Sequence, residues 1–166
     1  MPSSAEDVAR SYFDAIARRD LDAIESHYSD DVVVDALGQG ISRGPKEMRE
    51  FFAAIFAALP DSEMLTDRVL GGDGVAVVEW RLRGNFTGAP LFGIEPTGVW
   101  IEQRGCDVIE FAEDGKIARN TAYQDGIELL RQIGMMPPLD SPAERALKQA
   151  FNLTSRARKA LRERFG

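Results

Sequence analysis

The side chains that could perform acid–base chemistry here are carboxylates and hydroxyls, because the 166 residues include one histidine and one cysteine. The single histidine, His27, excludes a centre with several histidine ligands and leaves almost no room for a Ser-His-Asp triad. The single cysteine, Cys106, excludes an internal disulfide framework and a cysteine-rich zinc site. We therefore expect no metal centre. We interpret His27 as a packing residue and minor candidate base, and Cys106 as inert.

Asp107 is the most informative carboxylate. The alternation of side chains over residues 99–111 predicts a strand that turns Asp107 toward a mostly apolar face. Burial there would raise its pKa, and a neutral carboxyl in an apolar pocket can donate a hydrogen bond to a developing oxyanion. A structural carboxyl, bonded to a helix N–H or a tyrosine, is an equally open interpretation. Tyr12, on the apolar face of the first expected helix, is either its partner or a packing residue.

Two further aspartates stand at the ends of expected strands. Asp125 closes the last strand just before Gly126, so it could face the mouth of a cavity or cap the following helix. Asp35 follows the β-branched run 32–34 and could reach the rim of the same cavity. A shift of one residue in strand register would move Asp35 to the outer face.

Several apolar residues are expected to line a pocket. Trp80 lies on the inward face of its expected strand, where it could line a pocket or pack in the core. The loop 84–98 is long for a connection without secondary structure, which is typical of functional loops. We expect Phe92 and Ile94 to cover the pocket mouth, or else to close the end of the core.

Helices come first and strands after them, which predicts an α+β fold rather than alternating strands and helices. A cap at Ser4 begins the first helix, which ends before Arg18, and Pro45 begins the third. We expect three helices against one curved antiparallel sheet, a cone with an open mouth. The other expected elements are a helix over 21–28 and strands over 32–34, 63–70, 75–83, 99–111 and 116–124.

A change of composition at residues 135–140 separates a cone domain, 1–138, from a C-terminal helical extension, 139–166. Ser141 and Glu144 form a capping box at its start. An apolar stripe at helical spacing follows: Leu147, Phe151, Thr154, Ala157, Leu161 and Phe165. Residues 141–166 carry a net charge of +5, which leaves −12 for residues 1–140. We expect this helix to pack on the body or on a second subunit. The alternative is a helix for a membrane surface or an acidic partner.

Composition and charge narrow the class of protein. Hydrophobic residues make up 44% of the chain, enough for a packed core, and the net charge is −7. An acidic chain is unlike a nucleic-acid-binding protein, and no apolar run approaches the roughly 18 residues of a membrane span. The first residues show no basic and apolar signal segment. We therefore expect a cytoplasmic protein without nucleic-acid or membrane partners.

Several segments share the pattern of a known family. The most general is the helix 12–22 followed by 28–32. The more specific ones are 84–88, 92–98, 107–111 with 114–117, and 125–134. Over about residues 5–138 the chain resembles the SnoaL-like polyketide (ester) cyclases, within the superfamily of ketosteroid isomerase, scytalone dehydratase and limonene epoxide hydrolase.

The resemblance implies a cone-shaped α+β barrel, a site without a cofactor, and a homodimer. In the cyclases an aspartate matching Asp125 is the general acid and base of an intramolecular aldol closure. Tyr12 and Asp107 match the tyrosine and protonated aspartate of the oxyanion hole in ketosteroid isomerase. The isomerase's base has no counterpart, because Ala36 fills its position and Asp35 stands one residue earlier.

The chain departs from the cyclase pattern where Phe86 and Asn120 replace histidines of many relatives. We expect a cofactor-independent, polyketide cyclase-like enzyme that acts on a small hydrophobic molecule. The alternatives are an isomerase, an epoxide hydrolase that needs an arginine such as Arg119, or a non-catalytic ligand-binding dimer. The expected catalytic residues are Asp125, Asp107 and Tyr12, and the expected substrate contacts are Trp80, Phe86, Phe92, Ile94, Asp35 and Asn120.

Overall fold

The computed structural model describes residues 4–165, and of Phe165 only the backbone. The chain divides into two units, one that ends at Leu129 and one that begins at Leu130, and each is described by itself. The expected boundary between residues 138 and 139 lies inside the second unit. Residues 1–3, on which the expectation of no signal segment partly rests, lie outside the described part of the chain.

Three helices of the first unit begin where the sequence predicts. Helix α1 (Ala5–Ala17) starts at a capping box, in which the Ser4 hydroxyl accepts from the Asp7 N–H and the Asp7 carboxylate accepts from the Ser4 N–H. Helix α2 (Leu21–Ser26) is shorter than expected, because Tyr28 already belongs to a strand. Helix α3 (Gly44–Ala58) carries its proline in the first turn, as predicted.

One six-stranded sheet holds the unit together, in the order β2-β1-β6-β5-β4-β3. Its strands are β1 (Tyr28–Ala36), β2 (Gly40–Arg43), β3 (Glu63–Gly72), β4 (Val75–Asn85), β5 (Trp100–Phe111) and β6 (Ile117–Gln124). The α+β prediction is confirmed, but the sheet is not wholly antiparallel, because β1 and β6 run parallel. These two strands lie far apart in the chain, so no hairpin forces them into opposite directions. Strand β2 was not among the expected strands.

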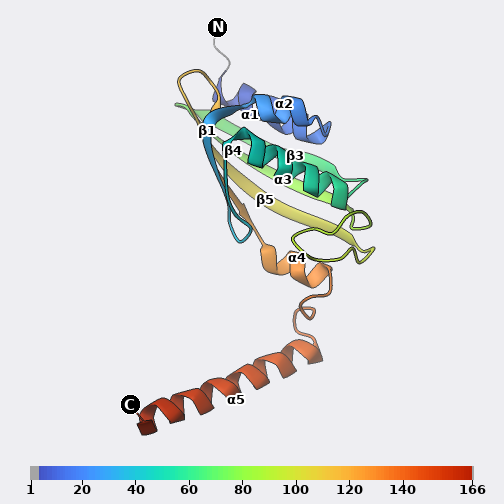
Figure 1. Ribbon diagram of the computed structural model, residues 1–166, viewed down its shortest axis with the longest axis vertical. Helices are drawn as coiled ribbons and strands as arrows, with labels where there is room; N and C mark the ends of the chain where they lie inside the picture. Colours follow the sequence, from blue (N-terminus) through green and yellow to red (C-terminus); the bar gives the residue numbers. More distant parts are fainter. Residues whose placement is uncertain (1–3, 166) are drawn as a thin grey trace. The chain divides into compact units, whose positions relative to one another are not determined.

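The three helices lie on one side of the curved sheet (Figure 1), where α1 contacts β3 and β4 and α3 contacts β1. The inner face of β4 shows the alternation that the sequence predicts. Ala76, Val78, Trp80 and Leu82 are buried, while the residues between them are exposed or half-buried. The helices and this face of the sheet therefore enclose the core that surrounds the site.

The second unit contains the end of helix α4 (Gly126–Gln132) and helix α5 (Pro142–Phe165). The Ser141 hydroxyl accepts from the Glu144 N–H at 3.1 Å, which confirms the predicted cap. The buried Glu144 carboxylate also pairs with Arg131 and Lys148 and accepts from the Asp140 N–H. Between residues 4 and 165, no helix combines the length and the apolar character needed to cross a bilayer.

Candidate active site

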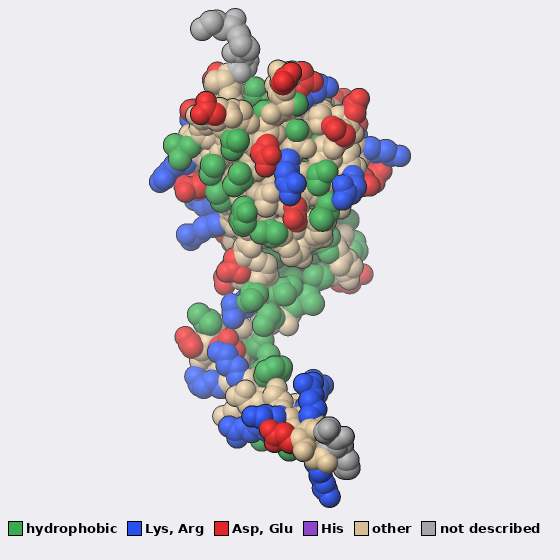
Figure 2. All heavy atoms as spheres, turned by 90° about the vertical axis from the view of Figure 1, so that its left-hand side faces the viewer, with side chains coloured by type: hydrophobic (Ala, Val, Ile, Leu, Met, Phe, Trp, Pro, Cys, Tyr) green, Lys and Arg blue, Asp and Glu red, His purple; other side chains and the backbone are tan. Residues whose placement is uncertain are grey.

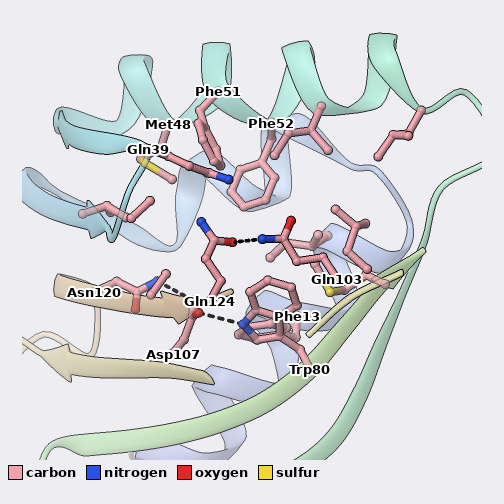
Figure 3. Close-up of a pocket in the computed structure, with 18 of the residues that line it drawn as sticks. Phe13, Gln39, Met48, Phe51, Phe52, Trp80, Gln103, Asp107, Asn120 and Gln124 are labelled. Atoms are coloured by element: carbon pink, nitrogen blue, oxygen red, sulfur yellow. Dashed lines mark hydrogen bonds between the residues drawn. The ribbon is translucent and has the colours of Figure 1, made fainter. Parts of the chain in front are cut away.

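A cavity of about 80 Å³ lies between helices α1 and α3 and the inner face of the sheet. Most of its lining is apolar, with Met48, Phe51 and Phe52 on the helix side (Figure 3). Seven lining residues carry polar groups: Tyr12, Gln39, Trp80, Gln103, Asp107, Asn120 and Gln124. Among the described residues no lysine, arginine or histidine lines it. Asp107 is therefore the one lining carboxylate in the described chain, within largely uncharged surroundings.

Asp107 projects from β5 into this cavity and is 6% exposed. One carboxylate oxygen accepts a hydrogen bond from the Trp80 indole N–H at 2.7 Å, and the other accepts from the Asn120 amide at 2.6 Å (Figure 3). Burial raises the pKa of Asp107 to about 6, although both hydrogen bonds act in the opposite direction. The side chain can therefore change its protonation state near neutral pH, as a proton donor or acceptor must.

Gly105 makes the contact between Trp80 and Asp107 possible. It is the direct cross-strand neighbour of Trp80, whereas Asp107 lies opposite Val78. The indole must therefore cross over residue 105 to reach the carboxylate. A Cβ atom at position 105 would lie 2.2 Å from Cζ2 of Trp80. Only glycine leaves room for the indole to lie in this position.

Asn120 is 2% exposed and comes from β6, next to β5. Its amide N–H holds Asp107, while its Oδ1 has no hydrogen-bond partner in the described chain. A buried acceptor without a partner is unfavourable, so this oxygen is available to a ligand that carries a hydrogen-bond donor. Asn120 thus holds the central carboxylate through a neutral N–H donor.

A pair of glutamines faces the cavity near Asp107. The Gln103 amide donates to the Gln124 carbonyl at 3.1 Å (Figure 3), and Gln39 lines the same space from the turn after β1. These residues were not among the expected ligand contacts. The alternation over 99–111 had placed Gln103 inward, so a polar side chain on that apolar face was an available signal.

Tyr12 lines the cavity, but no hydrogen bond joins its side chain to Asp107. Its hydroxyl is hydrogen-bonded to that of Tyr28, and both rings are buried. Burial raises the pKa of Tyr12 well above its usual value, so this hydroxyl stays protonated. The sequence predicted Asp107 as a possible partner of Tyr12. The structure shows a hydrogen bond between Tyr12 and Tyr28 instead.

Asp125 does not reach the cavity, which corrects the prediction of its position. Its exposed carboxylate accepts from the N–H groups of Ile127 and Glu128, both at 3.0 Å, and caps α4. The alternation along β6 explains this: Asn120, Ala122 and Gln124 line the cavity, so the next residue points outward. Of the two interpretations of Asp125, the helix cap is the one observed.

Three of the expected substrate contacts also lie outside the cavity lining. Asp35 alternates with the buried Val34 and Ala36 and so turns to the outer face of β1. Phe86 is buried in the core beside the end of β4. Ile94 closes a tight turn with Leu91 through two backbone hydrogen bonds.

Phe92 does line the cavity, as do Trp80 and Asn120. Its ring is half-exposed and lies 6.2 Å from that of Phe51. The cavity is smaller than the roughly 150 Å³ that accommodates benzene. A polycyclic ligand therefore requires residues at the mouth, such as Phe92, to move.

The remaining candidates lie elsewhere. His27 contacts the Ser11 hydroxyl and the Ala23 carbonyl on the helical surface. Cys106 turns to the outer face, and burial raises its thiol pKa. Arg81 and Arg119 pair with acids on that face, so neither supplies the arginine of an epoxide-hydrolase relay. Within residues 4–165, no three His, Cys, Asp or Glu side chains gather as a metal site.

A family model described as SnoaL-like polyketide cyclase matches residues 6–133. Among solved structures, AclR from Streptomyces galilaeus is similar with a TM-score of 0.70 and 18% identity, over 94% of this chain and 95% of AclR. TsrD from Streptomyces laurentii is similar with a TM-score of 0.70 and 19% identity, over 82% of this chain and 98% of TsrD. SalBIII is an epoxide hydrolase/cyclase-like enzyme of salinomycin pyran ring formation. It is similar with a TM-score of 0.62 and 16% identity, over 75% of this chain and 92% of SalBIII. At these identities the structures show a shared fold. No curated protein sequence matches significantly.

Proposed function

Because the chain belongs to the SnoaL-like polyketide cyclase family, we propose that it catalyses a cofactor-independent, aldol-type ring closure with Asp107 as its acid and base. One observation carries this proposal. A single carboxyl lies in an apolar cavity, and each of its oxygens holds one N–H donor. The substrate would be a small hydrophobic molecule with two carbonyl groups.

The proposed reaction moves one proton from carbon to oxygen. Ionised Asp107 removes a proton from the carbon beside a carbonyl, and the resulting enolate carbon attacks the second carbonyl carbon. A carbon–carbon bond forms, and the second carbonyl becomes an alkoxide. Protonated Asp107 then returns its proton to the alkoxide oxygen, so the carboxylate is regenerated without a cofactor.

Neighbouring groups support each state of this cycle. Trp80 and Asn120 stabilise the ionised carboxylate through their N–H donors. Tyr12 lines the same cavity and its hydroxyl stays protonated, so it would donate to the enolate oxygen while it accepts a hydrogen bond from Tyr28. The apolar lining keeps water from the enolate, which water would otherwise protonate.

The experiment follows the first step alone. Exchange of the α-protons of 2-tetralone in D₂O is measured by NMR with the wild-type protein, Asp107→Asn and Asp125→Asn. We expect Asp107→Asn to slow exchange by about 10²-fold or more, as for loss of a general base. Asp125→Asn, which keeps a capping side chain, should stay within about twofold.

Equal exchange rates for the wild-type protein and Asp107→Asn would overturn the catalytic proposal. A non-catalytic ligand-binding protein would then be the better interpretation. Unfolding curves of the three proteins show whether any loss of exchange reflects loss of structure.

A further inference from the structure

Helix α5 carries a large apolar surface that nothing in its own unit covers. Leu147, Phe151, Leu153 and Leu161 are each more than half exposed. At 100° per residue, Leu147, Phe151 and Leu161 fall on one side of the helix, over about 21 Å of its length. An exposed stripe of this kind marks an interaction surface.

The charges of α5 restrict what can bind there. Residues 141–166 carry seven Lys and Arg and two Asp and Glu, a net charge of +5. These basic side chains follow the helix along its length (Figure 2). Arg156 lies opposite the apolar stripe, and Lys148 and Lys159 lie about 100–120° around the helix from its centre. Arg158 falls within the stripe, and Arg162 lies at its edge. A second α5 would face like charges, so pairing between two such helices is disfavoured.

The mouth of the cavity is apolar and acidic, whereas α5 is apolar and basic. We assign the mouth to three segments, 36–41, 91–98 and 124–129, because each combines residues that line the cavity (Gln39, Leu91 with Phe92, and Leu129) with exposed residues. We call them the mouth segments. Their exposed apolar side chains include Ile41, Phe92 and Ile127. Their charged residues are Glu95, Asp125 and Glu128, all exposed, and no Lys or Arg occurs in them.

We propose that α5 of one copy binds across the mouth segments of a second copy. The apolar stripe would cover the exposed Phe92 and Ile127. Arg158, within the stripe, and Arg162, at its edge, would face the acids of the mouth segments. A bilayer is a poorer occupant, because residues 1–140 carry a net charge of −12 that an anionic lipid surface repels. Both complementary surfaces belong to one chain, so they occur at equal concentration in every solution of this protein.

Such binding would couple assembly to the site. A helix across the mouth excludes water from the cavity and must leave before a ligand enters or departs. Only this consequence rests on the proposed function, since the binding of α5 does not require Asp107 to react.

The direct test uses mixed single-cysteine variants with Cys106→Ala as background. Phe92→Cys protein is mixed with Phe151→Cys protein and treated with a short bismaleimide. We expect a cross-linked pair that contains one copy of each. The matched control replaces Phe151→Cys by Gln149→Cys, on the opposite side of α5, and should cross-link at least tenfold less. Absence of the mixed product, or an equal yield with the control variant, would overturn the proposal.

A second measurement tests the stripe in the full-length chain. Sedimentation should show that Leu147→Asp/Phe151→Asp dissociates at concentrations where the wild-type protein is dimeric. The control Gln149→Asp/Asn152→Asp, which adds the same charge on the polar side, should remain dimeric. A wild-type monomer that instead co-sediments with phosphatidylglycerol vesicles, and loses this property with Leu147→Asp/Phe151→Asp, would also overturn it. Neither measurement depends on 2-tetralone exchange, so the two proposals fail separately.

Discussion

The indole N–H of Trp80 donates a hydrogen bond of 2.7 Å to Asp107, although the two residues are not direct cross-strand neighbours. The bond runs diagonally across the inner face of the sheet, over Gly105. Its counterpart from Asn120 holds the other carboxylate oxygen. Burial raises the pKa of Asp107 to about 6, and both hydrogen bonds oppose this rise because they favour the ionised carboxylate.

Replacing Trp80 by phenylalanine should raise the pKa of Asp107 above about 6. The ring still fills much of the same volume, but the N–H that stabilises the carboxylate is gone. The pH profile of 2-tetralone exchange should therefore shift to higher pH. Trp100→Phe, at an exposed position on β5, is the control and should leave the profile in place. An unshifted profile for Trp80→Phe would show that the indole does not influence this carboxyl.

Asp107 should also make the stability of the protein depend on pH. Its folded pKa of about 6 lies above the ordinary value of 3.8, so the folded state binds more protons than the unfolded state between these pH values. The contribution of Asp107 to the free energy of unfolding is fully present below pH 3.8 and is lost as the pH rises through about 6. A shift of about two units corresponds to roughly 3 kcal/mol.

Urea unfolding at pH 4 and pH 7.5 measures this effect against Asp107→Asn, whose amide does not ionise. The wild-type free energy of unfolding, relative to the variant, should fall by up to about 3 kcal/mol between the two values. A constant difference would show that Asp107 has an ordinary pKa in the folded protein.

Gly105→Ala should destabilise the protein by about 1–3 kcal/mol, the usual cost of extra volume in a packed core. The added Cβ meets the Trp80 indole at 2.2 Å, so the indole must move away from Asp107. The pKa of Asp107 should then change in the same direction as in Trp80→Phe. Gly72→Ala is a matched control, because a Cβ at that strand position meets nothing within 4 Å. Equal stability of the two variants would contradict the close packing over Gly105.

Asp125→Ala should lower stability by about 1 kcal/mol while leaving proton exchange unchanged. The substitution removes the acceptor of two N–H groups at the start of α4, and nothing from the cavity. Urea unfolding and 2-tetralone exchange on the same sample separate the two effects. A large loss of exchange, reproduced by Asp125→Asn, would restore Asp125 as a candidate base.

Local rules were sufficient for much of this protein. The cap at Ser4, the proline that begins α3 and the cap at Ser141 depend on residues within one turn, so the sequence by itself determined where these helices start. Period-two alternation likewise turned Asp107 inward, because the side chains of any strand alternate. The same alternation along β6 turns Asn120, Ala122 and Gln124 inward, and it therefore predicts that Asp125, the next residue, points outward.

Only the tertiary structure decided which residues of distant strands lie next to one another. The partners of Asp107 lie 27 residues before it and 13 residues after it, and the pairing registers of β4, β5 and β6 bring them together. The parallel pairing of β1 with β6, and the exchange of an expected Tyr12–Asp107 bond for one between Tyr12 and Tyr28, have the same origin. Register and strand order arise from burial of the whole core, a sum over many contacts that no short segment contains.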